Sequence, residues 1–179
     1  MILSQPSDAL SFIIMPNELH IVTGAAGVGK STWGQSLAAK MHATFLDSDT
    51  LTEAVVRAGM KAAGLDPTDR DSPEYKSLFR DAVYQCLFAT TAENLAHTSV
   101  VIVGPFTREL QDVTWPQRLA QRFGVEPTIW FLFCSDETRQ ARITARANPR
   151  DRLKLKNWDQ HLASSKTPAF PVHQVQTDI

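Results

Sequence analysis

Short β-branched apolar runs alternate along the chain with longer segments of helical spacing. The apolar runs lie at 19–23 (LHIVT), 43–46, 99–103 (SVVIV), 128–133 (TIWFLF) and 172–176. The helical segments lie at about 29–42, 51–63, 73–97, 108–123, 135–147 and 154–164, and the fourth is interrupted near Trp115-Pro116. This alternation predicts an α/β, three-layer fold, in which helices cover both faces of a central parallel sheet of about five strands.

Length and composition suit one compact domain rather than two. The chain has 179 residues, of which 43% are hydrophobic. We expect one domain at 17–179, preceded by a flexible tail at 1–16. The apolar stretch at 10–15 is much shorter than a membrane span and has no basic residues before it, so no membrane association is expected. Cys86 and Cys134 lack metal-binding spacing, which favours buried thiols in a reducing cytoplasm.

The glycine-rich turn at 24–31 (GAAGVGKS) is the most specific motif in the sequence. It matches G-x-x-x-x-G-K-[ST] and lies between a predicted strand and a predicted helix. Backbone N–H groups and the helix N-terminus face phosphate oxygens in this motif. The candidate nucleotide-binding residues are Gly24, Ala25, Ala26, Gly27, Val28, Gly29, Lys30, Ser31 and Thr32. Lys30 is expected to reach the β- and γ-phosphates and Ser31 to bind Mg²⁺, so the predicted cofactors are ATP and Mg²⁺.

Two further stretches, FLDSD at 45–49 and RQARITARANPRDR at 139–152, complete a family resemblance. Together with the turn at 24–32 they resemble the P-loop kinase-like NTPases of the AAA-type, zeta-toxin, gluconate kinase and chloramphenicol phosphotransferase kind, over most of 19–165. The resemblance implies a kinase that phosphorylates a hydroxyl group. It also implies that Asp49 accepts the hydroxyl proton and that an arginine-rich lid lies at about 139–155.

The two aspartates after the second predicted strand suit this chemistry independently of the resemblance. Ligands of open parallel sheets bind beyond the carboxyl ends of the strands, beside the phosphate loop. A carboxylate at Asp49 can orient a substrate hydroxyl, act as general base or hold a water on Mg²⁺. Asp47 is a candidate metal partner of Ser31 if the chain stays extended there. A helix-capping or solvated carboxylate is the other interpretation of Asp47.

Basic residues are expected to line one face of the helix that begins near 135. Arg139, Arg142 and Arg146 are spaced by three and four residues. A guanidinium group stabilises the charge of a transferring phosphoryl group well, and Arg142 and Arg146 are the first candidates. A solvated basic face is the alternative. Trp158 is predicted to be a core residue.

The loop after the third predicted strand departs from the usual pattern of P-loop proteins. Its sequence at 103–108, VGPFTR, has no carboxylate where a metal ligand would be expected. Mg²⁺ would then depend on Ser31, phosphate oxygens and water, with help from Asp47 or Asp49. We expect this loop to turn toward the active site.

The predicted function is ATP-dependent phosphorylation of a hydroxyl group on a small molecule. The formal net charge of −1 disfavours a nucleic-acid partner but leaves it open. Acidic groups at Glu53, Asp66, Asp69 and Asp71 slightly favour a polyol or aminated acceptor over a phosphorylated one. Two alternatives stay open: a 5′-hydroxyl polynucleotide kinase, and a nucleotide-dependent switch or ATPase with little phosphotransfer. The absence of an [NT]KxD signature disfavours GTP.

Overall fold

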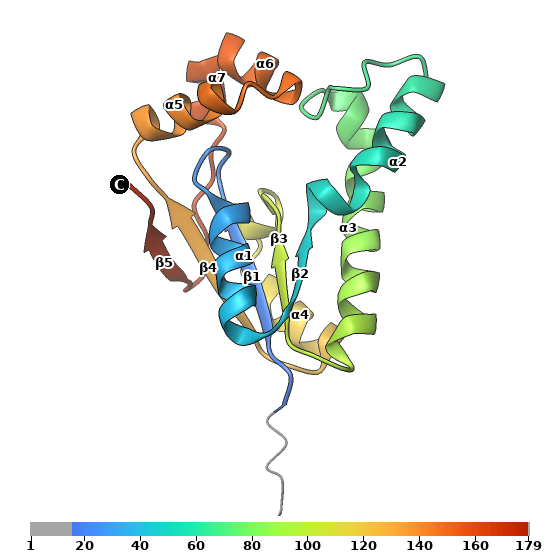
Figure 1. Cartoon of the computed structure of the whole chain (residues 1–179), viewed down its shortest axis with the longest axis vertical. Helices are drawn as coiled ribbons and strands as arrows, with labels where there is room; N and C mark the ends of the chain where they lie inside the picture. The colour runs from blue at the N-terminus through green and yellow to red at the C-terminus, as the bar shows by residue number, and fades with distance from the viewer. Residues whose placement is uncertain (1–15, 179) are drawn as a thin grey trace, which may run out of the picture.

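The computed structural model describes residues 16–178, which form one sheet of five parallel strands with helices around it (Figure 1). The strands are β1 (Leu19–Gly24), β2 (Thr44–Asp47), β3 (Val100–Val103), β4 (Pro127–Phe133) and β5 (His173–Gln176). Their spatial order is β2-β3-β1-β4-β5. The predicted fold class is thereby confirmed. The predicted tail at 1–16 lies, except for Pro16, outside the described residues.

The carboxyl ends of the strands meet at one edge of the sheet. In the parallel register Val103 pairs with both Val22 and Asp47, and Gly24 pairs with Leu132. The segments that leave β1, β2, β3 and β4 therefore start next to one another. This is the edge at which open parallel sheets bind their ligands.

Both faces of the sheet are covered because consecutive strand residues are apolar and point to opposite sides. On one face, Ala38 of α1 (Lys30–Met41) belongs to a buried cluster with Val22. On the other face, Leu87 of α3 (Pro73–Leu95) and Leu119 of α4 (Trp115–Phe123) share a cluster with Ile21. Ile21 and Val22 thus anchor the two layers of helices on the same strand.

The remaining helices surround the carboxyl edge of the sheet (Figure 1). They are α2 (Ser48–Ala62), η1 (Glu109–Gln111), α5 (Asp136–Arg146), η2 (Pro149–Asp151), α6 (Arg152–Lys156) and α7 (Trp158–Ala163). α2 starts directly after β2, three residues earlier than the apolar pattern predicts, because Asp47 caps it. The single helix predicted at 154–164 is wrong: Asn157, with ψ 47°, separates α6 from α7. No helix within 16–178 is long and apolar enough to cross a membrane.

Three predicted core residues lie nearer the surface than expected. Cys86 is exposed and Cys134 is only partly buried, so the prediction of core thiols is wrong for Cys86. Cys86 directly precedes the fully buried Leu87, and one residue along a helix turns the side chain by about 100°. Trp158 is half-buried outside the main core, with the Arg139 guanidinium carbon 5.6 Å from its ring centroid.

Gly34 allows α1 to lie close to the sheet. A Cβ atom at this position would lie 2.7 Å from Cγ2 of Val103 and 3.1 Å from Cε2 of Phe45. We expect Gly34→Ala to lower the free energy of unfolding by about 1 kcal/mol, because overpacking outweighs the gain in helix propensity. Urea denaturation measures the change. The exposed Gln35→Ala should shift stability by less than about 0.5 kcal/mol, and a G34A variant at least as stable as the wild type would contradict this expectation.

Candidate active site

A cleft of about 1200 Å³ lies over the carboxyl edge of the sheet. The loop at 24–33 lines it, together with residues 47–49, one side of α3 and the loop that follows β3. Arginines of the α5–α7 segment, residues 136–163, line it as well. The cleft therefore brings together the predicted nucleotide-binding, metal-binding and first-choice catalytic residues: Gly24, Ala25, Ala26, Gly27, Val28, Gly29, Lys30, Ser31, Thr32, Asp47, Asp49, Arg142 and Arg146.

The phosphate loop is a tight turn whose backbone fits a polyphosphate. α1 begins at Lys30, and its N-cap residue Gly29 supplies no side-chain hydrogen bond to the first turn. The N–H groups of that turn, at the positive end of the helix dipole, therefore suit an anion. Gly27 has a φ of +84°, and a Cβ atom there would lie 2.8 Å from the carbonyl oxygen of Arg139. A larger residue at 27 would disrupt the turn.

Lys30 is a partly buried cation at the end of this loop and lines the cleft. Burial lowers its pKa from 10.5 to about 8, and the nearby carboxylates of Asp49 and Asp47 only partly offset that effect. Its Nζ donates a hydrogen bond of 2.8 Å to the carbonyl oxygen of Ala25. Negatively charged phosphate oxygens bound in the loop would pair with this ammonium group and stabilise its charged form, which burial destabilises.

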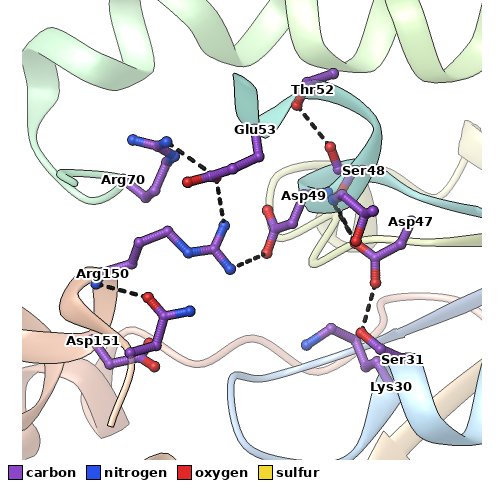
Figure 2. A network of polar contacts seen from close by, with 12 residues as sticks. Lys30, Ser31, Asp47, Ser48, Asp49, Thr52, Glu53, Arg70, Arg150 and Asp151 are labelled. Atoms are coloured by element: carbon purple, nitrogen blue, oxygen red, sulfur yellow. Dashed lines mark hydrogen bonds and ion pairs between the residues drawn. The ribbon is translucent and has the colours of Figure 1, made fainter. Parts of the chain in front are cut away.

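Asp47 joins β2 to the phosphate loop and to α2 (Figure 2). Its Oδ1 accepts a hydrogen bond of 2.9 Å from the backbone N–H of Asp49, and its Oδ2 accepts one of 2.6 Å from Ser31 Oγ. The capping interpretation of Asp47 is therefore confirmed, and the carboxylate also touches the predicted metal ligand. Two hard oxygen ligands beside a phosphate loop fit Mg²⁺, which keeps several waters. Within 16–178 no group of three or more His, Cys, Asp or Glu residues could hold a metal ion.

Asp49 lies in the first turn of α2 and its side chain is 58% exposed. Its Oδ2 lies 3.2 Å from Nη2 of Arg150, which comes from the α5–α7 segment (Figure 2). Nη1 of the same arginine lies 3.2 Å from Oε2 of Glu53, one helical turn further along α2. Arg150 therefore links the two walls of the cleft. The predicted lid includes this arginine, but nothing in the sequence indicated that Asp49 and Glu53 are its partners.

Arg139 has a different place from the one that helical spacing predicts. Its side chain is almost fully buried and does not line the cleft. Nε donates a hydrogen bond of 3.1 Å to the carbonyl oxygen of Ala26, and Nη1 pairs with Asp136 at 2.9 Å. Arg139 thus fastens the phosphate loop to α5. Of the three arginines expected to line one face of this helix, Arg139 therefore does not reach the cleft.

Arg142 and Arg146 do line the cleft, and each is held by a neighbour. Nη2 of Arg142 donates a hydrogen bond of 2.6 Å to the carbonyl oxygen of Thr177, whose hydroxyl donates one of 2.8 Å to the Val28 carbonyl. Arg146 forms two hydrogen bonds, of 2.6 and 2.8 Å, with the carboxylate of Asp151. Both guanidinium groups therefore lie beside the loop in fixed orientations.

The wall opposite the phosphate loop is more basic than the sequence suggests. Asp66 and Asp69 accept hydrogen bonds within their own turn and do not line the cleft. Glu53 and Asp71 pair with Arg70 at 3.1 Å and with Lys154 at 2.8 Å. The basis for preferring an aminated acceptor is therefore gone. Sequence reasoning missed the cations that line this wall: Arg70 in the loop before α3, and Lys76 and Arg80 on α3, whose spacing gave no sign of a site.

The loop after β3 turns toward the cleft, as expected. Gly104, Pro105, Thr107 and Arg108 all line it. The carbonyl oxygen of Pro105 accepts a hydrogen bond of 3.0 Å from Thr23 of β1, which fixes this loop beside the phosphate loop. Arg108 is 69% exposed and pairs with Asp81 at 2.9 Å.

A parallel sheet in this order, with a phosphate loop between β1 and α1, defines the chain as a P-loop NTPase of kinase-like fold. It belongs to the family described as "AAA domain", whose model matches residues 19–168. The predicted family resemblance is thus confirmed.

Individual relatives agree with this assignment. Shikimate kinase of Corynebacterium glutamicum is 35% identical over 98 residues, which make up 53% of this chain and 55% of that protein. The match thus spans about half the length of that relative.

Solved structures of kinases share the fold over most of the chain. A candidate kinase of Chloroflexus aurantiacus has a TM-score of 0.67 at 20% identity, over 92% of this chain and 90% of that one. APS kinase of Mycobacterium tuberculosis, in complex with AMPPNP and APS, has a TM-score of 0.56 at 16% identity, over 92% and 91%. A gluconokinase of Sinorhizobium meliloti has 0.52 at 18% identity, over 90% and 81%.

The lowered pKa of Lys30 predicts that ATP affinity depends on pH. Below pH 8 the ammonium form is present before and after binding, so affinity should be constant. Above pH 8 binding must first protonate Lys30, and the Kd should rise by up to about tenfold per pH unit until the pKa of the complex is reached. Isothermal titration calorimetry with ATP and Mg²⁺ at pH 7 to 9.5 measures this. Lys30→Met should bind weakly with a flat profile, and a flat wild-type profile would contradict the assignment.

Proposed function

We propose that this protein is a kinase that transfers the γ-phosphoryl group of ATP to a hydroxyl group of a small molecule. One observation carries the proposal: a carboxylate, Asp49, lines the same cleft as Lys30 and the phosphate loop. The match to a shikimate kinase and the fold shared with other kinases support the same reaction class. The acceptor hydroxyl would lie between Asp49 and the loop.

The main polar residues near the phosphate loop have distinct roles in this proposal. The N–H groups at 24–31 and Lys30 bind the phosphates, and Ser31 with Asp47 holds Mg²⁺, which would neutralise phosphate charge. Asp49 accepts the proton of the acceptor hydroxyl as the hydroxyl oxygen bonds to the γ-phosphorus; the bond from that phosphorus to the β-γ bridging oxygen breaks, and ADP leaves. Arg142 and Arg146 stabilise the negative charge on the transferring group. Asp49 is exposed enough for a hydroxyl to approach its carboxylate.

We further propose that the α5–α7 segment acts as the lid of the cleft. The ion pairs of Arg150 with Asp49 and Glu53, and of Lys154 with Asp71, hold it against α2 and the loop at 63–72. Because Arg150 contacts the carboxylate that would act as base, an incoming hydroxyl must compete with it. Acceptor binding and the arrangement of the lid are therefore coupled.

Asp49→Asn tests the proposal most directly. The amide keeps the shape of the side chain but cannot accept a proton, so we expect kcat to fall by about 100-fold or more. The Kd for ATP should change by less than about threefold. A coupled phosphotransfer assay and calorimetry measure the two values, and Asp159→Asn, an exposed carboxylate on α7, is the matched control. Full activity of D49N would remove the proposed base.

The acceptor is found by a screen with ATP and Mg²⁺ against sugars and other polyols, nucleosides, aminoglycosides and 5′-hydroxyl oligonucleotides. Transfer to one or more small molecules supports the proposal. Transfer to oligonucleotides alone would instead identify a polynucleotide kinase. Tight ATP binding without transfer to any acceptor would favour a nucleotide-dependent switch or ATPase.

A further inference from the structure

The side of the cleft formed by α3 and the loop after β3 has the features of an anion site. We call Lys76, Arg80 and Tyr84 of α3, with Thr107 and Arg108 of the loop, the acceptor wall; all five residues line the cleft. We propose that the acceptor carries a carboxylate or phosphate group in addition to its reacting hydroxyl, and that the acceptor wall binds this anion. The inference rests on the proposed function because it specifies the substrate class of the same site.

Arg80 is the residue that points most directly to an anionic ligand. Its Nη2 lies 2.7 Å from Oε2 of Glu109, and its guanidinium carbon lies 4.8 Å from the ring centroid of Tyr84. These contacts fix the guanidinium plane. Its Nη1 is buried, lies 3.7 Å from Oδ1 of Asp81 and has no hydrogen-bond partner within 16–178. A buried donor without a partner is costly, so a small shift of the side chain toward an anion in the cleft would be favourable.

The charges around Arg80 leave a cationic surplus on this wall. Glu109 pairs with Arg80, and Asp81 pairs with Arg108. These two carboxylates face three cations, because Lys76 lies one helical turn before Arg80 and also lines the cleft. Neither Glu109 nor Asp81 lines the cleft itself. An acceptor would therefore meet cations on this wall and the carboxylate of Asp49 at the start of α2.

The rest of the wall suits the body of a small hydroxylated molecule. The Tyr84 hydroxyl accepts a hydrogen bond of 3.1 Å from the backbone N–H of Phe106, so its position is fixed. Val83 and Leu110 add apolar surface to the cleft beside it, and Thr107 adds a hydroxyl group. A short carbon skeleton can contact this surface while its anionic end reaches Arg80. In this arrangement the anionic group of the acceptor binds at Arg80, and its reacting hydroxyl faces Asp49.

The experiment compares acceptors that differ in one charged group. D-Glucitol is paired with D-gluconate, and D-glucose with D-glucose 6-phosphate, so that the two arms distinguish a carboxylate from a phosphate. Phosphotransfer with ATP and Mg²⁺ is measured at equal concentrations. Binding of D-gluconate and D-glucose 6-phosphate in the presence of a non-hydrolysable ATP analogue is measured by calorimetry, which needs no turnover. We expect at least one anionic member to exceed its neutral partner by about tenfold in kcat/KM.

Two variants link the preference to the acceptor wall. Arg80→Gln should raise the KM and the Kd for the preferred anion by about tenfold or more, with a smaller change in kcat. Lys76→Gln, at an exposed position that folding does not depend on, should raise both by a few-fold. Arg118→Gln, on α4 and outside the cleft, loses only an exposed pair with Asp112 and should change neither.

The outcomes separate this inference from the proposed function. Transfer to neutral acceptors as fast as to their anionic partners would overturn the inference and leave the kinase assignment intact. An anion preference that persists in R80Q and K76Q would overturn the role of the acceptor wall. If no acceptor is phosphorylated here or in the broader screen, the kinase assignment fails, and the calorimetric comparison of wild type with R80Q and K76Q still decides whether the wall binds anions.

Discussion

The contact between the phosphate loop and α5 is the interaction on which the rest of the site depends. Arg139 reaches from α5 to the carbonyl oxygen of Ala26, and Gly27 lies against the backbone of Arg139 so closely that no side chain fits between them. α5 itself is anchored by Ile143, which is fully buried. The loop, and the arginines one and two turns further along α5, therefore share one rigid frame. An arginine that does not line the cleft thus helps to determine where two others lie.

Several charged side chains in the cleft have low solvent exposure, which is unusual in a globular protein. Pairing with side chains of opposite charge makes this possible. Lys30 is the extreme case, since burial favours its neutral form. Several of the other cations have carboxylate partners from distant parts of the chain, such as Arg150 with Glu53 and Lys154 with Asp71. Breaking such pairs leaves uncompensated charge, which costs more than the pairs contribute. The cleft is consequently arranged around charges that a polyanion would satisfy.

Local signals made the sheet and the phosphate loop predictable from the sequence. The runs at 99–103 and 128–133 are almost entirely apolar. The motif at 24–31 specifies its own conformation through its glycines and the start of the following helix. Asp49 could be nominated because a residue just beyond a strand end must lie near the loop. The capping role of Asp47 could be offered only as an alternative, since it depends on whether the chain turns into a helix at once.

Long-range contacts explain what the sequence could not predict. Arg139, Arg142 and Arg146 have the same local signature, yet Arg139 is buried because it meets Ala26, 113 residues away. Arg150 meets Glu53 across 97 residues, which no spacing rule anticipates. The acidic loop at 66–72 looked like a substrate contact, but two of its carboxylates cap their own turn. The charged residues of the sequence therefore indicated a polar site, but the acidic acceptor contacts that they suggested were wrong, because the wall is basic.

The two helices at the end of the α5–α7 segment are short, and this makes the structure of the cleft sensitive to ionic strength. α6 and α7 contain five and six residues and bury none of them. Helices of this length are not stable by themselves, so this part of the chain relies on electrostatic attachment rather than on a core. Dissolved ions weaken exposed attachments of this kind. Ionic strength should therefore loosen this corner of the molecule long before it affects the sheet.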